Sequence, residues 1–150
     1  EISQKWDAGD ILAQTVFDVS DRETLESLSI RSQLAAKSLL SETVRDIEGL
    51  WARKKPQQDG SYWAMPQKAD RTITWDMSVD EIDRIVRAFS KFEPFLFIED
   101  VRYFVRKIDF WKENHHFKVG SVVHETNREK VFAASDGLVV LSNFVRSDEA

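Results

Sequence analysis

The spacing of apolar residues predicts two short extended segments at the start of the chain. Residues 2–6 and 11–19 carry β-branched and aromatic side chains in the proportion typical of strands. The polar run Asp-Ala-Gly-Asp at residues 7–10 separates them. Such a run favours a sharp turn, because Asp caps nearby backbone amides and Gly tolerates a positive φ.

A long helix is predicted next. Ser20 and Glu23 have the spacing of a capping box, which marks its expected start, and Gly49 is its expected end. The length is unusual for one helix, so a break at residues 29–32 is left open. Apolar residues recur along it at three- and four-residue steps, so one face is expected to pack on a sheet. These residues are Leu25, Leu28, Ala35, Leu39, Leu40, Val44 and Ile47.

The stretch that follows, residues 51–72, is polar and interrupted by Pro and Gly, which predicts a linker lying over a surface. Tyr62 and Trp63 are expected to hold this linker down. Trp75 is expected to act as a hydrophobic anchor between the linker and the next domain.

The second half of the chain predicts one helix followed by short strands. Ser78 and Glu81 form a second capping-box pattern, and an apolar stripe follows them. Asp136-Gly137 is a turn signal between the last two strands. One helix and about five antiparallel strands predict a small open barrel. The expected strands are 95–98, 101–108, 120–124, 131–134 and 138–144.

Composition adds three limits to this picture. The chain has 150 residues, 42% of them hydrophobic, and no cysteine, which suits a globular protein of the reducing cytoplasm. No apolar run is long enough to predict a membrane span. The net charge of −5 disfavours a polynucleotide partner, since tight binding of nucleic acid usually needs a clustered basic face.

The run Asp-x-Gly-Asp-Ile-Leu-x-Gln, at residues 7–14, resembles a signature of the folate-dependent formyltransferases, the family of methionyl-tRNA and sugar N-formyltransferases. Further matches to that family follow in its order and at about its spacing, so the resemblance covers essentially the whole chain. They are Gln57 and Gln58, Tyr62, Asp70, Ile73-Thr74-Trp75, Glu81-Ile82 and Arg87-Ala88-Phe89.

The resemblance implies a fold and an activity. Residues 1–50 would be the α/β end of a Rossmann-like catalytic domain, 51–72 the linker, and 73–150 a small α+β, OB-like open β-barrel domain. The activity would be transfer of a formyl group from 10-formyltetrahydrofolate to a primary amine. The family's catalytic Asn-x-His does not occur in this sequence. Catalysis is therefore expected only as part of a longer chain, which a start at Glu1 also suggests.

The resemblance also implies roles for four residues. Asp7 would be the catalytic carboxylate, which tunes a histidine supplied from earlier in the chain. Gly9 and Asp10 would lie on the cofactor side, and Arg87 would contact the acceptor. From the residues alone, Asp10 is also interpreted as a turn cap, and Arg87 as the partner of Asp83 one helical turn earlier.

The identity of the acceptor is left open by the sequence. The acidic charge balance favours a small amine, such as a nucleotide-linked amino sugar, over methionyl-tRNA. The segment 90–95 departs from the Pro-rich stretch of the family.

The spacing of His115, His116 and His124 does not fit a metal site. A homodimer is compatible with the sequence. The hypothesis from another class is a non-catalytic binding module in which the Asp-x-Gly turn is only structural.

Overall fold

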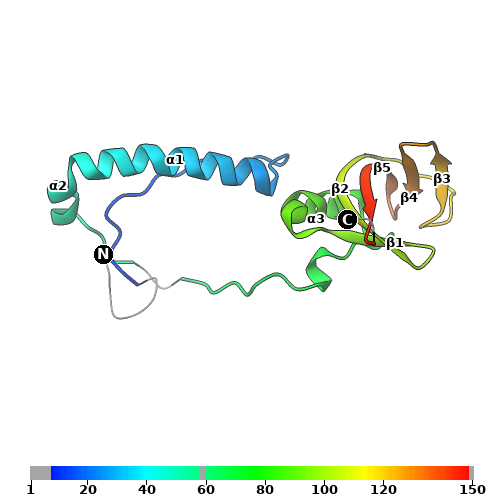
Figure 1. The fold of residues 1–150 in the computed structure, drawn as a ribbon, viewed down its shortest axis with the longest axis horizontal. Coiled ribbons are helices and arrows are strands. Elements are labelled where there is room, and N and C mark those ends of the chain that lie inside the picture. The colour runs from blue at the N-terminus through cyan, green and yellow to red at the C-terminus, as the bar shows by residue number, and fades with distance from the viewer. Residues whose placement is uncertain (1–7, 58–59, 149–150) are drawn as a thin grey trace. The chain divides into compact units, whose positions relative to one another are not determined.

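The computed structural model describes residues 8–57 and 60–148 (Figure 1). The chain divides into two compact units. We call the first, Glu1–Asp21 with Ser27–Ala64, the helical unit, and the second, Arg22–Glu26 with Met65–Ala150, the strand unit. Within the described residues, no helix is long and apolar enough to cross a membrane.

The helical unit contains α1 (Leu25–Arg45, whose first two residues belong to the strand unit) and α2 (Ile47–Ala52). The predicted capping box at Ser20 is wrong, because the chain forms a turn at residues 21–22 and α1 begins only at Leu25. The helix runs through residues 29–32 without a break. It ends at Arg45 instead of Gly49, and Gly49 lies inside α2.

Gly49, inside α2, lies close to the carboxylate of Asp46. A Cβ at Gly49 would meet the Asp46 carboxylate, which would have to rotate away to make room for it. Asp46 in turn forms an ion pair with Arg53 at 2.9 Å. The chain turns at Asp46, the residue between α1 and α2.

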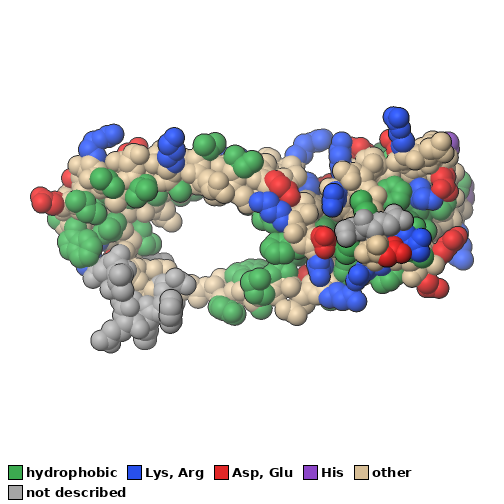
Figure 2. Space-filling view, in the orientation of Figure 1, with side chains coloured by type: hydrophobic (Ala, Val, Ile, Leu, Met, Phe, Trp, Pro, Cys, Tyr) green, Lys and Arg blue, Asp and Glu red, His purple; other side chains and the backbone are tan. Residues whose placement is uncertain are grey.

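The predicted strand at 11–19 is also wrong, and the one at 2–6 lies outside the described residues. Ile11 forms a single antiparallel bridge with Lys55, through backbone hydrogen bonds of 2.8 and 3.0 Å. The apolar stripe of α1 packs on no sheet among the described residues: α1 has no buried residue, and hydrophobic side chains lie on its visible surface (Figure 2). Tyr62 and Trp63 are 92% and 87% exposed, so their predicted anchoring role is wrong.

The strand unit confirms the predicted order of one helix and five strands. Its sheet is antiparallel with the order β1-β2-β5-β4-β3, and it forms a half-barrel with α3 packed against β2 and β5 (Figure 1). Register shifts near Lys107, in the β2–β5 pair, bend the sheet. The elements are η1 (Ala69–Arg71), α3 (Val79–Phe89), η2 (Ser90–Phe92), β1 (Phe95–Ile98), β2 (Val101–Lys112), β3 (Val122–Glu125), β4 (Lys130–Ala133) and β5 (Gly137–Arg146).

One hydrophobic core joins α3 to the sheet. Trp75, just before α3, stacks on the ring of Phe132 with centroids 4.4 Å apart, which confirms its predicted role as an anchor. The turn at Asp136-Gly137 also forms as predicted. The largest fully buried side chains of this core come from α3 and four of the strands. They are Val79, Ile82, Leu96, Val105, Phe132, Val139 and Leu141.

Candidate functional site

The Asp-x-Gly-Asp motif is described only from Ala8 onward, and its first member, Asp7, lies outside the described residues. Gly9 forms a bend, and Asp10 forms an ion pair with Lys54 at 3.0 Å, where both side chains are about one-third exposed. Together with the bridge between Ile11 and Lys55, this ion pair fixes residues 10–11 against the segment that follows α2. Asp10 therefore joins two segments of the helical unit.

The side chain of Asp10 is engaged within the helical unit. The carboxylate of Asp10 is engaged by Lys54, whose ammonium also lies 4.8 Å from the centre of the Trp51 ring. A cavity of about 270 Å³ in the same unit is lined by Ile47, Glu48 and Trp51.

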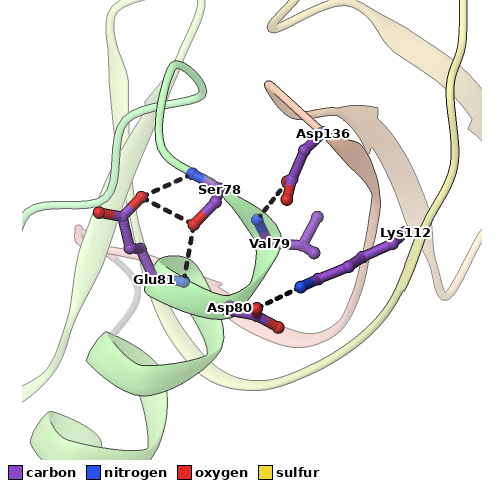
Figure 3. Close-up of polar contacts among 6 residues, drawn as sticks. All are labelled: Ser78, Val79, Asp80, Glu81, Lys112 and Asp136. Atoms are coloured by element: carbon purple, nitrogen blue, oxygen red, sulfur yellow. Dashed lines mark hydrogen bonds and ion pairs between the residues drawn. The ribbon is translucent and has the colours of Figure 1, made fainter.

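The N-terminal end of α3 is held by the capping box that the sequence predicts (Figure 3). The backbone nitrogen of Glu81 donates to Ser78 Oγ at 3.3 Å, and the backbone nitrogen of Ser78 donates to Glu81 Oε2 at 2.8 Å. The hydroxyl of Ser78 donates to the same carboxylate at 2.7 Å. These hydrogen bonds favour the ionised carboxylate and lower the pKa of Glu81 below its usual value.

Two contacts from distant strands support the same helix end (Figure 3). Asp136, in the turn between β4 and β5, accepts a hydrogen bond from the backbone nitrogen of Val79 at 2.8 Å. Lys112, at the end of β2, pairs with Asp80 at 2.5 Å, and this hydrogen bond raises the pKa of Lys112. Negative charge near a helix N-terminus is also stabilised by the helix dipole.

Arg87 lies in the last turn of α3 and makes two contacts. Its Nε pairs with Asp83 at 2.6 Å, which confirms the predicted ion pair, and its Nη1 donates to the backbone oxygen of Glu23 at 2.9 Å. Ser90 donates to Glu26 at 2.5 Å, and this hydrogen bond lowers the pKa of Glu26. The C-terminal end of α3 thus holds the segment that leads into α1. The sequence could not indicate this, because Glu23 lies 64 residues away.

The predicted site residues belong to different units. Gly9 and Asp10 lie in the helical unit, whereas Arg87 lies in the strand unit. His115 lies in the loop after β2, where its Nε2 is 3.0 Å from Ala134 O. Among residues 8–57 and 60–148, no three His, Cys, Asp or Glu side chains gather as a metal would require.

A capped helix packed on an antiparallel half-barrel defines the class of this domain as small α+β, and comparison with known proteins gives its family. Residues 66–148 match the family described as the formyl transferase C-terminal domain. Because this match covers more than half of the chain, the chain belongs to that family, and the resemblance of the sequence to the formyltransferases is confirmed.

Three relatives illustrate the similarity. A methionyl-tRNA formyltransferase of Treponema denticola is 34% identical over 59% of this chain and 28% of its own. A HypX variant from Aquifex aeolicus has the same fold, with a TM-score of 0.79 at 16% identity, over 95% of this chain and 26% of that one. An N-formyltransferase from Helicobacter canadensis, in complex with folinic acid and dTDP-3-aminofucose, superimposes with a TM-score of 0.64 at 16% identity. The superposition covers 96% of this chain and 53% of that one. The chain therefore spans about half or less of the proteins it matches.

Proposed function

We propose that this chain is the C-terminal part of an N-formyltransferase that transfers a formyl group from 10-formyltetrahydrofolate to a primary amine. The observation that carries this proposal is the family match over residues 66–148, preceded in the same chain by the Asp-x-Gly-Asp-Ile-Leu-x-Gln signature. Residues 1–50 would then be the end of a Rossmann-like catalytic domain, and residues 51–72 the linker to the barrel.

Asp7 is the catalytic residue in this proposal. A carboxylate that orients and charges an imidazole suits formyl transfer, because the attacking amine must lose a proton and the carbonyl oxygen needs a hydrogen-bond donor. The histidine would come from a preceding part of the polypeptide. Gly9 would let the backbone approach the folate, and Asp10 would hold the turn in place through Lys54. That the Helicobacter enzyme was solved with folinic acid supports a folate as cofactor.

The favoured acceptor is a nucleotide-linked amino sugar. The net charge of −5 supports this choice, as does the dTDP-3-aminofucose bound by the Helicobacter N-formyltransferase. The second candidate is methionyl-tRNA, which is favoured by the 34% identity to the Treponema methionyl-tRNA formyltransferase. Arg87 would contact the acceptor in either case, in addition to its contacts with Asp83 and Glu23.

The test is a formyl-transfer assay on the complete polypeptide that contains this segment. We expect Asp7→Asn to lower turnover by several orders of magnitude with the fold intact, whereas Asp18→Asn, at an exposed carboxylate outside the motif, should keep the activity of the wild type. Turnover of Asp7→Asn near that of the wild type would remove Asp7 from the mechanism.

The same assay distinguishes the acceptors and the non-catalytic alternative. Turnover of a dTDP-linked amino sugar that changes little with salt would support the small acceptor. A KM that rises steeply with salt, seen only with methionyl-tRNA, would support the second candidate. No turnover of either acceptor by the complete polypeptide would support a non-catalytic binding module.

A further inference from the structure

Three cationic side chains surround one buried aromatic ring on the outer face of the β1–β2 hairpin. The ammonium of Lys68 lies 5.7 Å from the centre of the Phe95 ring, and the guanidinium carbons of Arg71 and Arg102 each lie 5.8 Å from it. Lys68 and Arg71 come from the segment of η1, and Arg102 comes from β2. Phe95 itself is only 1% exposed.

These three cations have no acidic partner in the described part of the chain, since none of the ion pairs found there includes them. Arg71 donates to the backbone oxygens of Phe92 and Glu93, which fix its position but leave its charge uncompensated. The carboxylate of Asp70, in the same segment, accepts from the backbone nitrogen of Gln67 at 2.7 Å. Acidic and basic side chains are interspersed over the strand unit (Figure 2), so the lack of pairing here is a local property.

An exposed aromatic ring adjoins this cationic group. Phe97 is 49% exposed, and its ring meets that of Phe95 edge to face with centroids 5.9 Å apart. Arg102 is the cross-strand neighbour of Phe97, and its guanidinium also lies 5.2 Å from the Phe104 ring. The intervening residue, Leu96, points into the core, so these aromatic rings and cations share the opposite face of the hairpin.

A purely structural explanation accounts for only part of this arrangement. The aliphatic stems of Lys and Arg can cover a ring, and cation–π contacts add modest stability, which explains why Phe95 is buried. It does not explain why Phe97 stays exposed beside them. Nor does it explain why three neighbouring cations lack a carboxylate, although the chain has 26 Asp and Glu residues.

We propose that this face binds a nucleoside diphosphate, with the phosphates on Lys68, Arg71 and Arg102 and the base stacked on Phe97. Arg guanidinium groups bind phosphate oxygens through paired hydrogen bonds, and an aromatic ring accepts any base. One exposed ring provides for one base, whereas a nucleic-acid strand needs several successive rings. The net charge of −5 likewise favours a small anion over a long one.

The nucleoside diphosphate could come from either of two sources. It is the nucleotide part of the amino-sugar acceptor proposed above, or it is a free nucleotide. Only the first source rests on the proposed function. The site as such does not, so a protein that fails to transfer formyl groups can still bind a nucleoside diphosphate here.

The test is calorimetric titration of the complete polypeptide with dTDP, inorganic pyrophosphate and thymidine. We expect Arg102→Gln to weaken binding of dTDP and of pyrophosphate about tenfold or more, as the loss of a charge-assisted contact should. Phe97→Ala should weaken binding of dTDP and leave that of pyrophosphate unchanged. Arg106→Gln, an exposed cation on the same strand, and Phe117→Ala, an aromatic residue 50% exposed elsewhere, are the matched controls and should bind like the wild type.

Equal effects of Arg102→Gln and Arg106→Gln, or no binding of dTDP by the wild type at millimolar concentration, would overturn the proposal. So would affinity for a single-stranded oligonucleotide that rises with each added nucleotide. To find the source of the ligand, Arg102→Gln is assayed with the dTDP-linked acceptor. A raised KM assigns the site to the acceptor, and an unchanged KM with lost dTDP binding assigns it to a free nucleotide. Thermal unfolding of each variant shows whether it is folded.

Discussion

The carboxylate of Asp136 caps the first turn of α3 by accepting a hydrogen bond from the backbone nitrogen of Val79 at 2.8 Å, across 57 residues of sequence. The first amides of a helix have no partner within the helix, so an acceptor from elsewhere satisfies one of them. This contact ties the β4–β5 turn to the helix that packs on the sheet, and both belong to the part of the chain that matches the family.

Removing this cap should destabilise the strand unit. We expect Asp136→Ala to lower the free energy of unfolding by about 1 kcal/mol, the usual effect of losing a helix cap. Asp136→Asn keeps an acceptor oxygen, so its free energy of unfolding should fall clearly less. Urea unfolding followed by circular dichroism measures both, and equal losses in the two variants would show that the carboxylate charge, and not the cap, is what matters.

The capping box should make stability depend on pH in the acidic range. The pKa of Glu81 in the folded protein lies below its usual value of 4.5, so its contribution is complete above pH 4.5 and is lost as the pH falls through the folded-state pKa. The stability of Glu81→Gln should therefore decrease less than that of the wild type on acidification below pH 4.5. Other carboxylates contribute equally to the free energy of unfolding of both proteins. The difference between the two pH curves of this free energy therefore isolates Glu81. Parallel curves would contradict this.

Gly137 should not tolerate any side chain. A Cβ there would lie 2.2 Å from the backbone oxygen of Trp111 in the neighbouring strand, and the strand pairing prevents that oxygen from moving away. We expect Gly137→Ala to lower the free energy of unfolding by about 2 kcal/mol or more, within the range for overpacked sites. Gly60 has no atom within 4 Å of the corresponding position, so Gly60→Ala should change the midpoint of thermal unfolding very little.

Arg87 should order the start of α1. Replacing it by Ala removes the contact with the backbone oxygen of Glu23, so the amides of residues 25–28 should exchange hydrogen faster. Asp83→Asn breaks the ion pair but leaves Arg87 free to contact Glu23, and should have a smaller effect on the same amides. If Arg87 also contacts the acceptor, Arg87→Ala raises KM and Asp83→Asn does not. Unchanged exchange in Arg87→Ala would show that Glu23 is held by other contacts.

The strand unit could be predicted well because its signals are local. Ser78 and Glu81 lie three residues apart, and the turn at Asp136-Gly137 follows from its own two residues. Short runs of apolar residues predict where each strand lies along the chain. The exact strand order does not, because which strands pair depends on contacts such as those between β2 and β5.

The helical unit was predicted less well, because the start and end of α1 depend on contacts that sequence patterns do not reveal. The capping-box pattern at Ser20 was present, but the segment near Glu23 is fixed by Arg87 and Ser90, and α1 begins after it. Likewise the bend came at Asp46, where the side chain pairs with Arg53, and not at the glycine.

The candidate site shows the same division between local and distant contacts. The pair of Arg87 and Asp83 follows from helical spacing, and it was found. The cations around Phe95 come from two segments about thirty residues apart in sequence, and only the strand register brings Arg102 beside Phe97. Counting charges along the sequence could not reveal this group.

The two caps on α3 also have a consequence for the order of folding. The capping box closes a loop of three residues, whereas the contact with Asp136 closes one of 57, and the longer loop costs more entropy to close. We therefore expect Ser78→Ala mainly to slow refolding and Asp136→Ala mainly to speed unfolding, which stopped-flow measurements in urea can separate. One helix end would then carry separate determinants of how fast the domain forms and how long it lasts.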